Sequence, residues 1–169
     1  MKYLLSIIIV QLALFADGFG SSRNGVAPVN NALYLKECGS CHFAYQPGLL
    51  PEKAWTKMMG NLANHFDSDA SLDEQTTATL THYLQQNSAE KFMEYKRSSR
   101  IVKSLRGNET PDSISSTPYM KRKHDEIRPS LITQKEVKGI FNCIACHTTA
   151  DKGIYSERDI KIPNYGRWE

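Results

Sequence analysis

The sequence predicts a mostly helical protein made of short helices and loops and arranged as two small lobes. Apolar residues recur at helical spacing in several short segments, and no segment shows the alternation of apolar and polar residues that is typical of a strand. A stretch containing glycine, proline and several serines over residues 97–116 indicates a linker between two groups of such segments. With 169 residues, the chain can form one compact domain or two very small ones, but not a large catalytic architecture.

Capping patterns and apolar spacing predict where the helices lie. A helix over residues 31–38 leads into the first of two cysteine pairs, and a second over 51–65 begins with a proline, which suits a first helical position. A Ser-x-x-Glu capping box predicts a third helix over 71–87. A Thr-x-x-Glu box predicts a fourth over 133–144, running directly into the second cysteine pair.

The charge balance excludes a protein that depends on binding nucleic acid. Lysine and arginine number 21 against 18 aspartates and glutamates, and the net charge of +3 is too small for the strongly basic surface that such binding requires. Basic residues do gather in two short runs, over 96–106 and 121–123. Such runs are usually solvated surface, but they also suit an acidic protein partner that complementary charge would steer to them.

The first twenty residues have the pattern of an export signal. Lys2 gives a short positive segment, residues 3–15 are largely apolar, and small residues follow within 16–20. This apolar run is well short of the roughly 20 residues that a spanning helix needs, although an uncleaved anchor is the alternative. We therefore expect a cleaved signal peptide at 1–20 and a periplasmic mature protein.

Two C-x-x-C-H motifs use all four cysteines of the chain. They are Cys38-Gly39-Ser40-Cys41-His42 and Cys143-Ile144-Ala145-Cys146-His147. This is the attachment pattern of c-type haem, in which two thiols on one tight turn bond to the same porphyrin and the adjacent histidine reaches its iron. The knuckles of a zinc ribbon lie roughly 15–20 residues apart, far closer than these motifs, and a thioredoxin-like pair needs a βαβ setting that is missing here. The sequence therefore predicts two covalently bound haem c groups.

This assignment gives each lobe its own cofactor. We expect an N-terminal haem lobe over 21–96, the linker over 97–116 and a C-terminal haem lobe over 117–169. The four cysteines are the predicted attachment residues, and His42 and His147 are predicted iron ligands.

The residues alone leave the second ligand of each iron open, since histidine and methionine are both common choices. His65 lies in the predicted N-terminal lobe and His124 in the C-terminal lobe. His82 shares a helix face with polar residues, so we expect it to face water. Met120, one turn before His124, is the main competing methionine.

The motifs and their surroundings resemble the small dihaem cytochrome c family, whose photosynthetic-bacterial members partner an oxygen-binding monohaem cytochrome of the sphaeroides type. The resemblance spans about residues 31–163. In the first half it is carried by the first motif with Tyr45-x-Pro47-x-Leu49-Leu50-Pro51, Trp55 and His65-Phe66. In the second half it is carried by Thr117-Pro118-Tyr119, His124-x-x-Ile127, Asn142 with the second motif, Ala150, Gly153 and Ile160-x-Ile162-Pro163. It implies a cytochrome c-like fold with two bis-histidine haems, in which His65 and His124 are the second ligands. It also implies two partners, a monohaem c-type cytochrome and a membrane-bound cytochrome b.

The predicted coordination decides between classes of function. With two strong ligands on each iron, no position remains for peroxide, nitrite or oxygen, and the irons are restricted to outer-sphere electron transfer. The sequence thus favours a non-enzymatic electron carrier. The alternative is a dihaem peroxidase or small-ligand reductase with one open iron site, which usually needs a longer chain. Docking to a membrane complex, and with it peripheral membrane contact, stays open.

Overall fold

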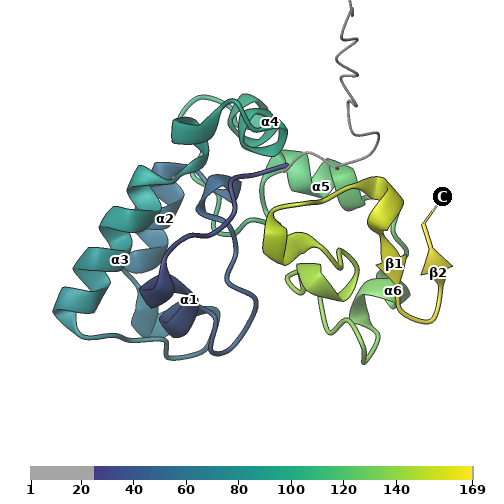
Figure 1. Cartoon of the computed structure of the whole chain (residues 1–169), viewed down its shortest axis with the longest axis horizontal. Helices are drawn as coiled ribbons and strands as arrows, with labels where there is room; N and C mark the ends of the chain where they lie inside the picture. Colours follow the sequence, from purple (N-terminus) through teal and green to yellow (C-terminus); the bar gives the residue numbers. More distant parts are fainter. Residues whose placement is uncertain (1–24, 169) are drawn as a thin grey trace, which may run out of the picture.

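The computed structural model describes residues 25–168, which form a mostly helical fold (Figure 1). The α-helices are α1 (Ala32–Cys38), α2 (Glu52–Met59), α3 (Glu74–Gln86), α4 (Lys96–Ser104), α5 (Pro118–His124) and α6 (Pro129–Thr133). The 3-10 turns are η1 (Pro47–Leu49), η2 (Leu62–Asn64), η3 (Ala89–Phe92), η4 (Cys143–Ala145), η5 (Ala150–Lys152) and η6 (Glu157–Asp159). An antiparallel pair of two-residue strands, β1 (Lys161–Ile162) and β2 (Gly166–Arg167), follows. The predicted helical class is confirmed, and the predicted signal peptide at 1–20 lies outside the described residues.

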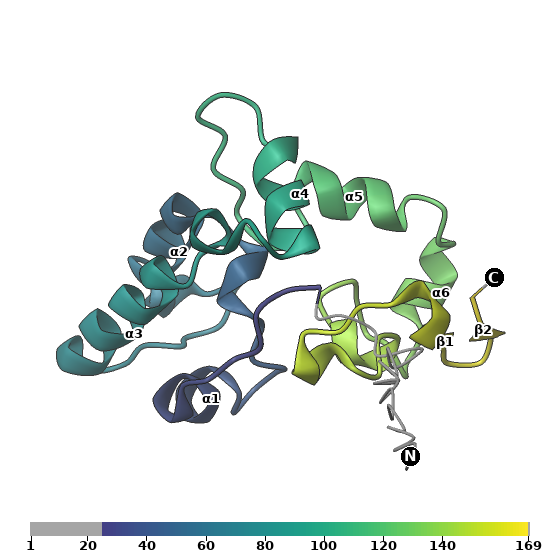
Figure 2. The same cartoon turned by 45° about the horizontal axis from the view of Figure 1, so that its top comes forward.

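The helices form two groups. Figure 1 places α1, α2 and α3 on one side, and α5, α6 and the strand pair on the other, with α4 above both. The same grouping holds in Figure 2, where α4 lies against α5, and these two helices are in contact. The first half of the chain therefore forms one group and the second half the other.

The first two helices begin at defined caps. The Asn31 side chain accepts a hydrogen bond from the Tyr34 backbone N–H (2.8 Å), so the helix predicted over 31–38 is confirmed to within a residue. The helix predicted over 51–65 is too long. Pro51 caps α2, the helix ends before Gly60, and the chain continues through η2 to His65.

The third helix starts later than its capping box suggests. The carboxylate of Asp73 accepts a hydrogen bond from the Thr76 backbone N–H (2.9 Å) and begins α3, so the predicted start at Ser71 is wrong. The predicted end near Asn87 is confirmed. Along α3, Leu80 and Leu84 are fully buried, and α2 packs against this helix.

The predicted linker, residues 97–116, begins with a packed helix. Most of α4 falls inside it, and both Ser98 and Ile101 are fully buried. The Ser98 hydroxyl donates to the Gly48 carbonyl (2.9 Å), which ties α4 to the first half of the chain. Composition pointed to a loop because many polar residues surround these two positions, but the positions lie three apart on one helix face.

The helix predicted over 133–144 is wrong. The short helix α6 begins at Pro129 and ends at Thr133, so the supposed cap is the last residue of a helix. The chain then turns through Lys138 (φ 66°) and Gly139 (φ 150°) before η4. The φ of Gly139 is one that side-chain-bearing residues rarely adopt, and it separates α6 from the second motif.

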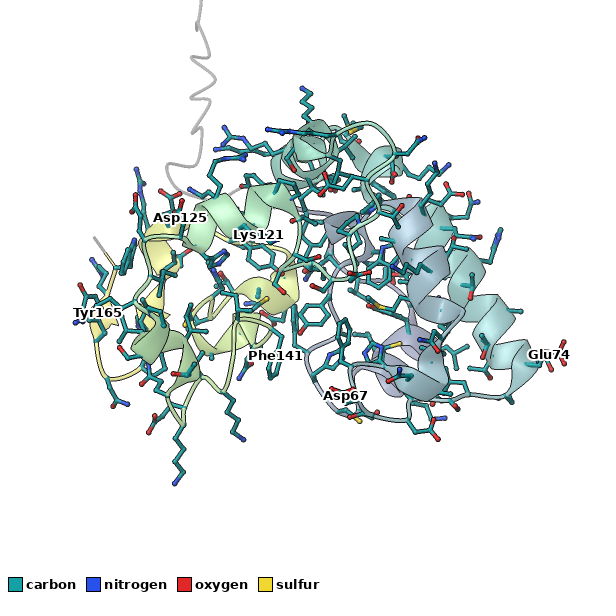
Figure 3. The ribbon with its side chains drawn as sticks, turned by 180° about the vertical axis from the view of Figure 1, so that it is seen from behind. Asp67, Glu74, Lys121, Asp125, Phe141 and Tyr165 are labelled. Carbon is teal, nitrogen blue, oxygen red and sulfur yellow. The ribbon has the colours of Figure 1, made fainter. Side chains whose placement is uncertain are left out.

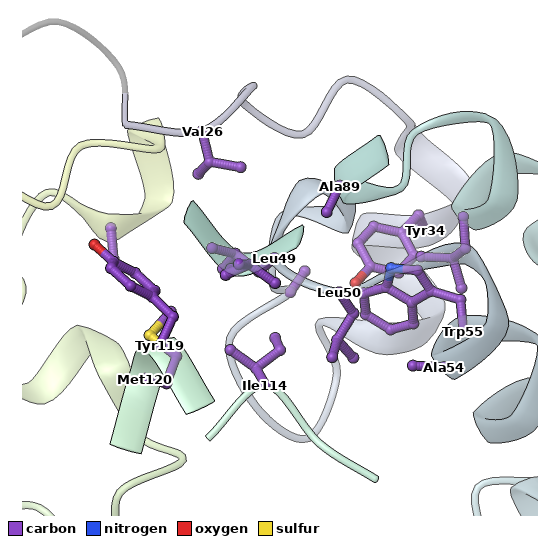
Figure 4. Close-up of a cluster of buried hydrophobic side chains, with 14 of the residues drawn as sticks. Val26, Tyr34, Leu49, Leu50, Ala54, Trp55, Ala89, Ile114, Tyr119 and Met120 are labelled. Atoms are coloured by element: carbon purple, nitrogen blue, oxygen red, sulfur yellow. The ribbon is translucent and has the colours of Figure 1, made fainter. Parts of the chain in front are cut away.

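One cluster of buried side chains joins the two groups (Figure 4). It contains Leu49, Leu50 and Trp55 from the first half and Tyr119 and Met120 from α5. The two halves therefore share a core instead of each burying its own. Within residues 25–168, no helix has both the length and the apolar character needed to cross a membrane.

Packing between α2 and α3 predicts how two neighbouring substitutions differ. Leu84→Ala removes a side chain that is 1% exposed and leaves a cavity, so we expect the free energy of unfolding to fall by about 2–5 kcal/mol. His82→Ala on the exposed face of α3 should change it by less than about 0.5 kcal/mol. Chemical denaturation of the holoprotein, followed by far-UV circular dichroism, measures both values. Equal losses in the two variants would contradict this account of the core.

Candidate functional site

The first C-x-x-C-H motif follows directly from α1. Cys38 is the last residue of the helix, and the turn after it is closed by the Gly39 N–H, which donates to the Leu35 carbonyl (3.1 Å). A Cβ on Gly39 would lie 2.2 Å from that carbonyl oxygen, so this position requires glycine. The Nδ1 atom of His42 lies 2.8 Å from the Phe43 carbonyl. With a proton on Nδ1 donated to that carbonyl, Nε2 is free to bind a metal.

The His65 ring lies opposite the His42 ring within the first group of helices. The ring centroids are 6.2 Å apart, and the ring planes differ by 23°. His65 is held by a tight turn, in which its backbone N–H donates to the Ser68 carbonyl (2.8 Å). The turn passes through Phe66 (φ 51°) and Asp67 (φ 64°), two consecutive non-glycine residues in the left-handed region. Such backbone strain persists only where the surrounding structure enforces it, and it is typical of functional sites.

The second motif has a matching arrangement with a different angle. Cys143 begins the turn η4 and Cys146 follows it, and the His147 backbone N–H donates to the Cys143 carbonyl (2.8 Å). His124, the last residue of α5, lies opposite His147 with 6.2 Å between ring centroids and 82° between ring planes. The Nδ1 of His124 lies 2.8 Å from the Met120 carbonyl, which again leaves Nε2 free.

Burial keeps two of these histidines neutral near pH 7. Loss of solvent lowers the pKa of His147 to about 4, with smaller contributions from the nearby charges of His124 and Arg97. Burial and then the charge of His42 also lower the pKa of His65. The neutral imidazole is the form that binds a metal. The Nδ1 of His147 is buried without a hydrogen-bond partner in the part of the chain that the structure describes.

The cysteines form two separate pairs. No disulfide joins any of the four cysteines, and burial raises the pKa of Cys38 and of Cys143 to about 11. Within residues 25–168, no three side chains of histidine, cysteine, aspartate or glutamate come together as a metal site. A tetrahedral zinc site is therefore not formed here, because it needs three or four such ligands.

The spacing of each histidine pair fits one metal ion between two imidazoles. Two metal–nitrogen bonds of about 2 Å, together with the distance from each nitrogen to its ring centre, give a centroid separation of about 6 Å. Both pairs have this separation. Since the described residues supply only two ligands per site, the other coordination positions must come from a bound molecule, as they do in haem.

A single cavity of about 980 Å³ connects the two sites. All eight predicted residues line it: Cys38, Cys41, His42, His65, His124, Cys143, Cys146 and His147. Its volume is at the upper end of the roughly 300–1,000 Å³ that is typical of ligand and cofactor pockets. In Figure 3, Phe141 lies on the side of its group that faces the other group of helices, and Asp67 lies on the facing side of that other group. The fold thus brings both sets of candidate residues to one shared hollow.

The remaining candidates lie elsewhere or play another part. His82 is exposed on α3, as predicted. Met120 is 8% exposed and belongs to the buried cluster, while its carbonyl lies beside His124. Sequence reasoning assigned no role to Tyr45, which it used only for the resemblance, and it missed Tyr155; their rings pack against His42 (5.0 Å) and His147 (5.4 Å). The signal that could have identified these two tyrosines is their position in the sequence, close to the two motifs.

Comparison with known proteins places the chain among relatives. A family model described as dihaem cytochrome c matches residues 34–155. A solved dihaem cytochrome c from Shewanella baltica is 38% identical with a TM-score of 0.68, and the match covers 82% of this chain and 98% of that one. A solved dihaem cytochrome c from Rhodobacter sphaeroides is 37% identical, also with a TM-score of 0.68, and covers 77% of this chain and 100% of that one. A comparison with curated proteins found no match.

The matched span contains both motifs together with His65 and His124. The predicted family, the cytochrome c-like fold and the predicted cofactors are therefore confirmed. The chain belongs to the dihaem cytochrome c family, and its cofactors are two haem c groups.

Proposed function

We propose that the protein is an electron carrier in which each C-x-x-C-H motif holds one haem c group between two histidines. The N-terminal haem is attached to Cys38 and Cys41 with His42 and His65 as ligands, and the C-terminal haem is attached to Cys143 and Cys146 with His147 and His124 as ligands. The observation that carries this proposal is the 6.2 Å separation of the rings in both histidine pairs. When bound, the haems supply two one-electron iron couples.

The proposed ligation favours a carrier over an enzyme. If both histidines of a pair bind the iron, no position would remain for a substrate, and the site would be limited to accepting and releasing electrons. His42 and His124 are each fixed by a contact between Nδ1 and a backbone carbonyl, which orients the ring before the iron is bound. Residues of both sites line one cavity, so the two haems would be held next to the same interior space.

The basic residues of α4 and α5 suit docking of an acidic partner. Lys96, Arg100 and Lys103 are exposed on one face of α4 at helical spacing, and residues 121–123 are exposed on α5. The helix α5 ends at His124, so a partner on this surface would lie next to the C-terminal haem. We propose a monohaem c-type cytochrome as this partner, with a membrane cytochrome b as a second, in agreement with the resemblance described above.

The proposed setting is the periplasm. The pattern of residues 1–20 supports export through a cleaved signal peptide. Covalent attachment of haem to C-x-x-C-H motifs also takes place outside the cytoplasm, so export and cofactor agree.

Covalent attachment at each motif predicts the haem content of a simple variant. Acid–acetone extraction of the wild-type protein should leave two haems with the polypeptide. The double variant Cys143→Ser and Cys146→Ser should keep one, because the motif at Cys38 is intact. The pyridine haemochrome spectrum, divided by protein concentration, measures both. One haem in the wild-type protein, or two in the variant, would refute the assignment.

Replacing one proposed ligand should change one potential. In His65→Met, a thioether replaces an imidazole on the N-terminal iron, and methionine ligation raises the reduction potential. Spectroelectrochemical titration should therefore show one midpoint moved upward and the other nearly unchanged. His82→Met on the exposed face of α3 is the control and should move neither. If His65→Met moves both midpoints strongly, or neither, the proposed pairing is wrong.

Closed coordination predicts that native protein does not bind carbon monoxide. Both irons should be six-coordinate and low-spin, so the visible spectrum of the fully reduced protein should not change when carbon monoxide is added. Mild denaturation, which releases the histidines, serves as the positive control for binding. Rapid binding by the native protein together with turnover of peroxide would replace the carrier with the dihaem peroxidase or small-ligand reductase.

A further inference from the structure

Two adjacent residues after the first motif hold the second motif on both of its sides. The Tyr45 hydroxyl donates to the Phe141 carbonyl (2.5 Å), just before Cys143. The Gln46 side-chain amide donates to the Ala150 carbonyl (2.5 Å), just after His147. The second motif is therefore fixed at both ends by a dipeptide that follows His42 closely in sequence.

A third hydrogen bond connects Gln46 to Tyr155, whose ring packs against His147. The Tyr155 hydroxyl donates to the carbonyl oxygen of the Gln46 side chain (2.6 Å). Gln46 is fully buried, and Tyr155 is 5% exposed. Both polar atoms of the Gln46 side chain are thus paired in a place that water does not reach. Losing one of these bonds would leave a buried polar group without a partner, which is costly.

The same residues also lie against the proposed iron ligands. The Tyr45 ring packs 5.0 Å from the His42 ring, and the Tyr155 ring packs 5.4 Å from the His147 ring. A path of contacts therefore runs from His42 through Tyr45 and Gln46 to Tyr155 and His147. Apolar contacts alone would let the two motifs shift relative to each other, whereas these hydrogen bonds are directional and fix one arrangement of the motifs.

We propose that Tyr45 and Gln46 are positioning residues that fix the placement of the two haem c groups relative to each other, and so set how strongly the haems interact. The proposal rests on the attachment of one haem at each motif, as argued above. Interaction between two charged centres varies inversely with their separation and with the effective dielectric constant around them. The hydrogen bonds between the motifs fix the separation, and the burial of Gln46 and Tyr155 excludes water from that part of the contact.

The test uses holoprotein variants that remove hydrogen bonds but keep the packing. Tyr45→Phe loses the bond to Phe141, Tyr155→Phe loses the bond to Gln46, and both retain their rings against the histidines. Gln46→Leu loses both hydrogen bonds of the Gln46 side chain, to Ala150 and from Tyr155, and replaces it with a side chain of similar size. Tyr83→Phe is the control, because Tyr83 lies on α3 and does not line the cavity. If Gln46→Leu does not fold, the two tyrosine variants still decide the question.

Two measurements report on the interaction between the haems. The first is the exciton couplet in the Soret circular dichroism spectrum, which depends on the distance and angle between the two chromophores. The second is the separation between the two midpoint potentials. We expect Tyr45→Phe, Tyr155→Phe and Gln46→Leu to lose couplet amplitude and to change the separation of the potentials, while Tyr83→Phe matches wild type.

The outcomes separate this inference from the proposed function. If every variant keeps two haems, a low-spin spectrum and an unchanged couplet and potential separation, the positioning role is refuted and the carrier stands. If the wild-type protein holds fewer than two covalent haems, the proposed function fails, and this inference fails with it. If Tyr83→Phe changes the couplet as much as Tyr45→Phe does, the effect is a general response to the loss of a tyrosine hydroxyl, and the specific role is refuted.

Discussion

The local structure of this small protein depends on one constraint, the spacing within two pairs of histidines. To hold the iron as proposed, each pair must stay far enough apart to admit a metal ion and near enough for both nitrogens to bind it, and both pairs have ring centroids 6.2 Å apart. A different feature of the backbone produces this spacing at each site. A left-handed turn at Phe66 and Asp67 directs His65 toward His42, whereas His124 owes its place to the end of α5.

Local sequence patterns predicted the family and the cofactors better than they predicted the helix boundaries. The C-x-x-C-H motifs name their cofactor because attachment needs those residues at adjacent positions, whatever the fold around them. Helix boundaries depend on contacts that are distant in sequence. The Thr-x-x-Glu box at Thr133 failed because α6 had already begun at Pro129, and α4 was missed because its buried face consists of little more than Ser98 and Ile101. Tyr155 and Gln46 meet only in the folded chain, so their bond could not be read from either motif.

The cofactors also complete a core that the chain does not fill. Phe66 and Phe141 are 60% and 54% exposed, and both line the cavity that contains the proposed haem ligands. Large apolar side chains around a hollow indicate a surface that a ligand covers. We therefore regard haem binding and folding as linked in this chain, with the shared cluster around Leu49 as the part that side chains alone maintain.

The two iron sites differ in ways that order their potentials. The guanidinium of Arg97 lies 5.2 Å from the centre of the Tyr155 ring, which packs against His147, so a fixed positive charge is near the C-terminal site. That site is also enclosed enough to leave the His147 Nδ1 buried. Positive charge and burial both disfavour the additional charge of ferric iron and so raise its reduction potential. The C-terminal haem should therefore have the higher potential in the wild-type protein, and the midpoint that responds to His65→Met should be the lower of the two.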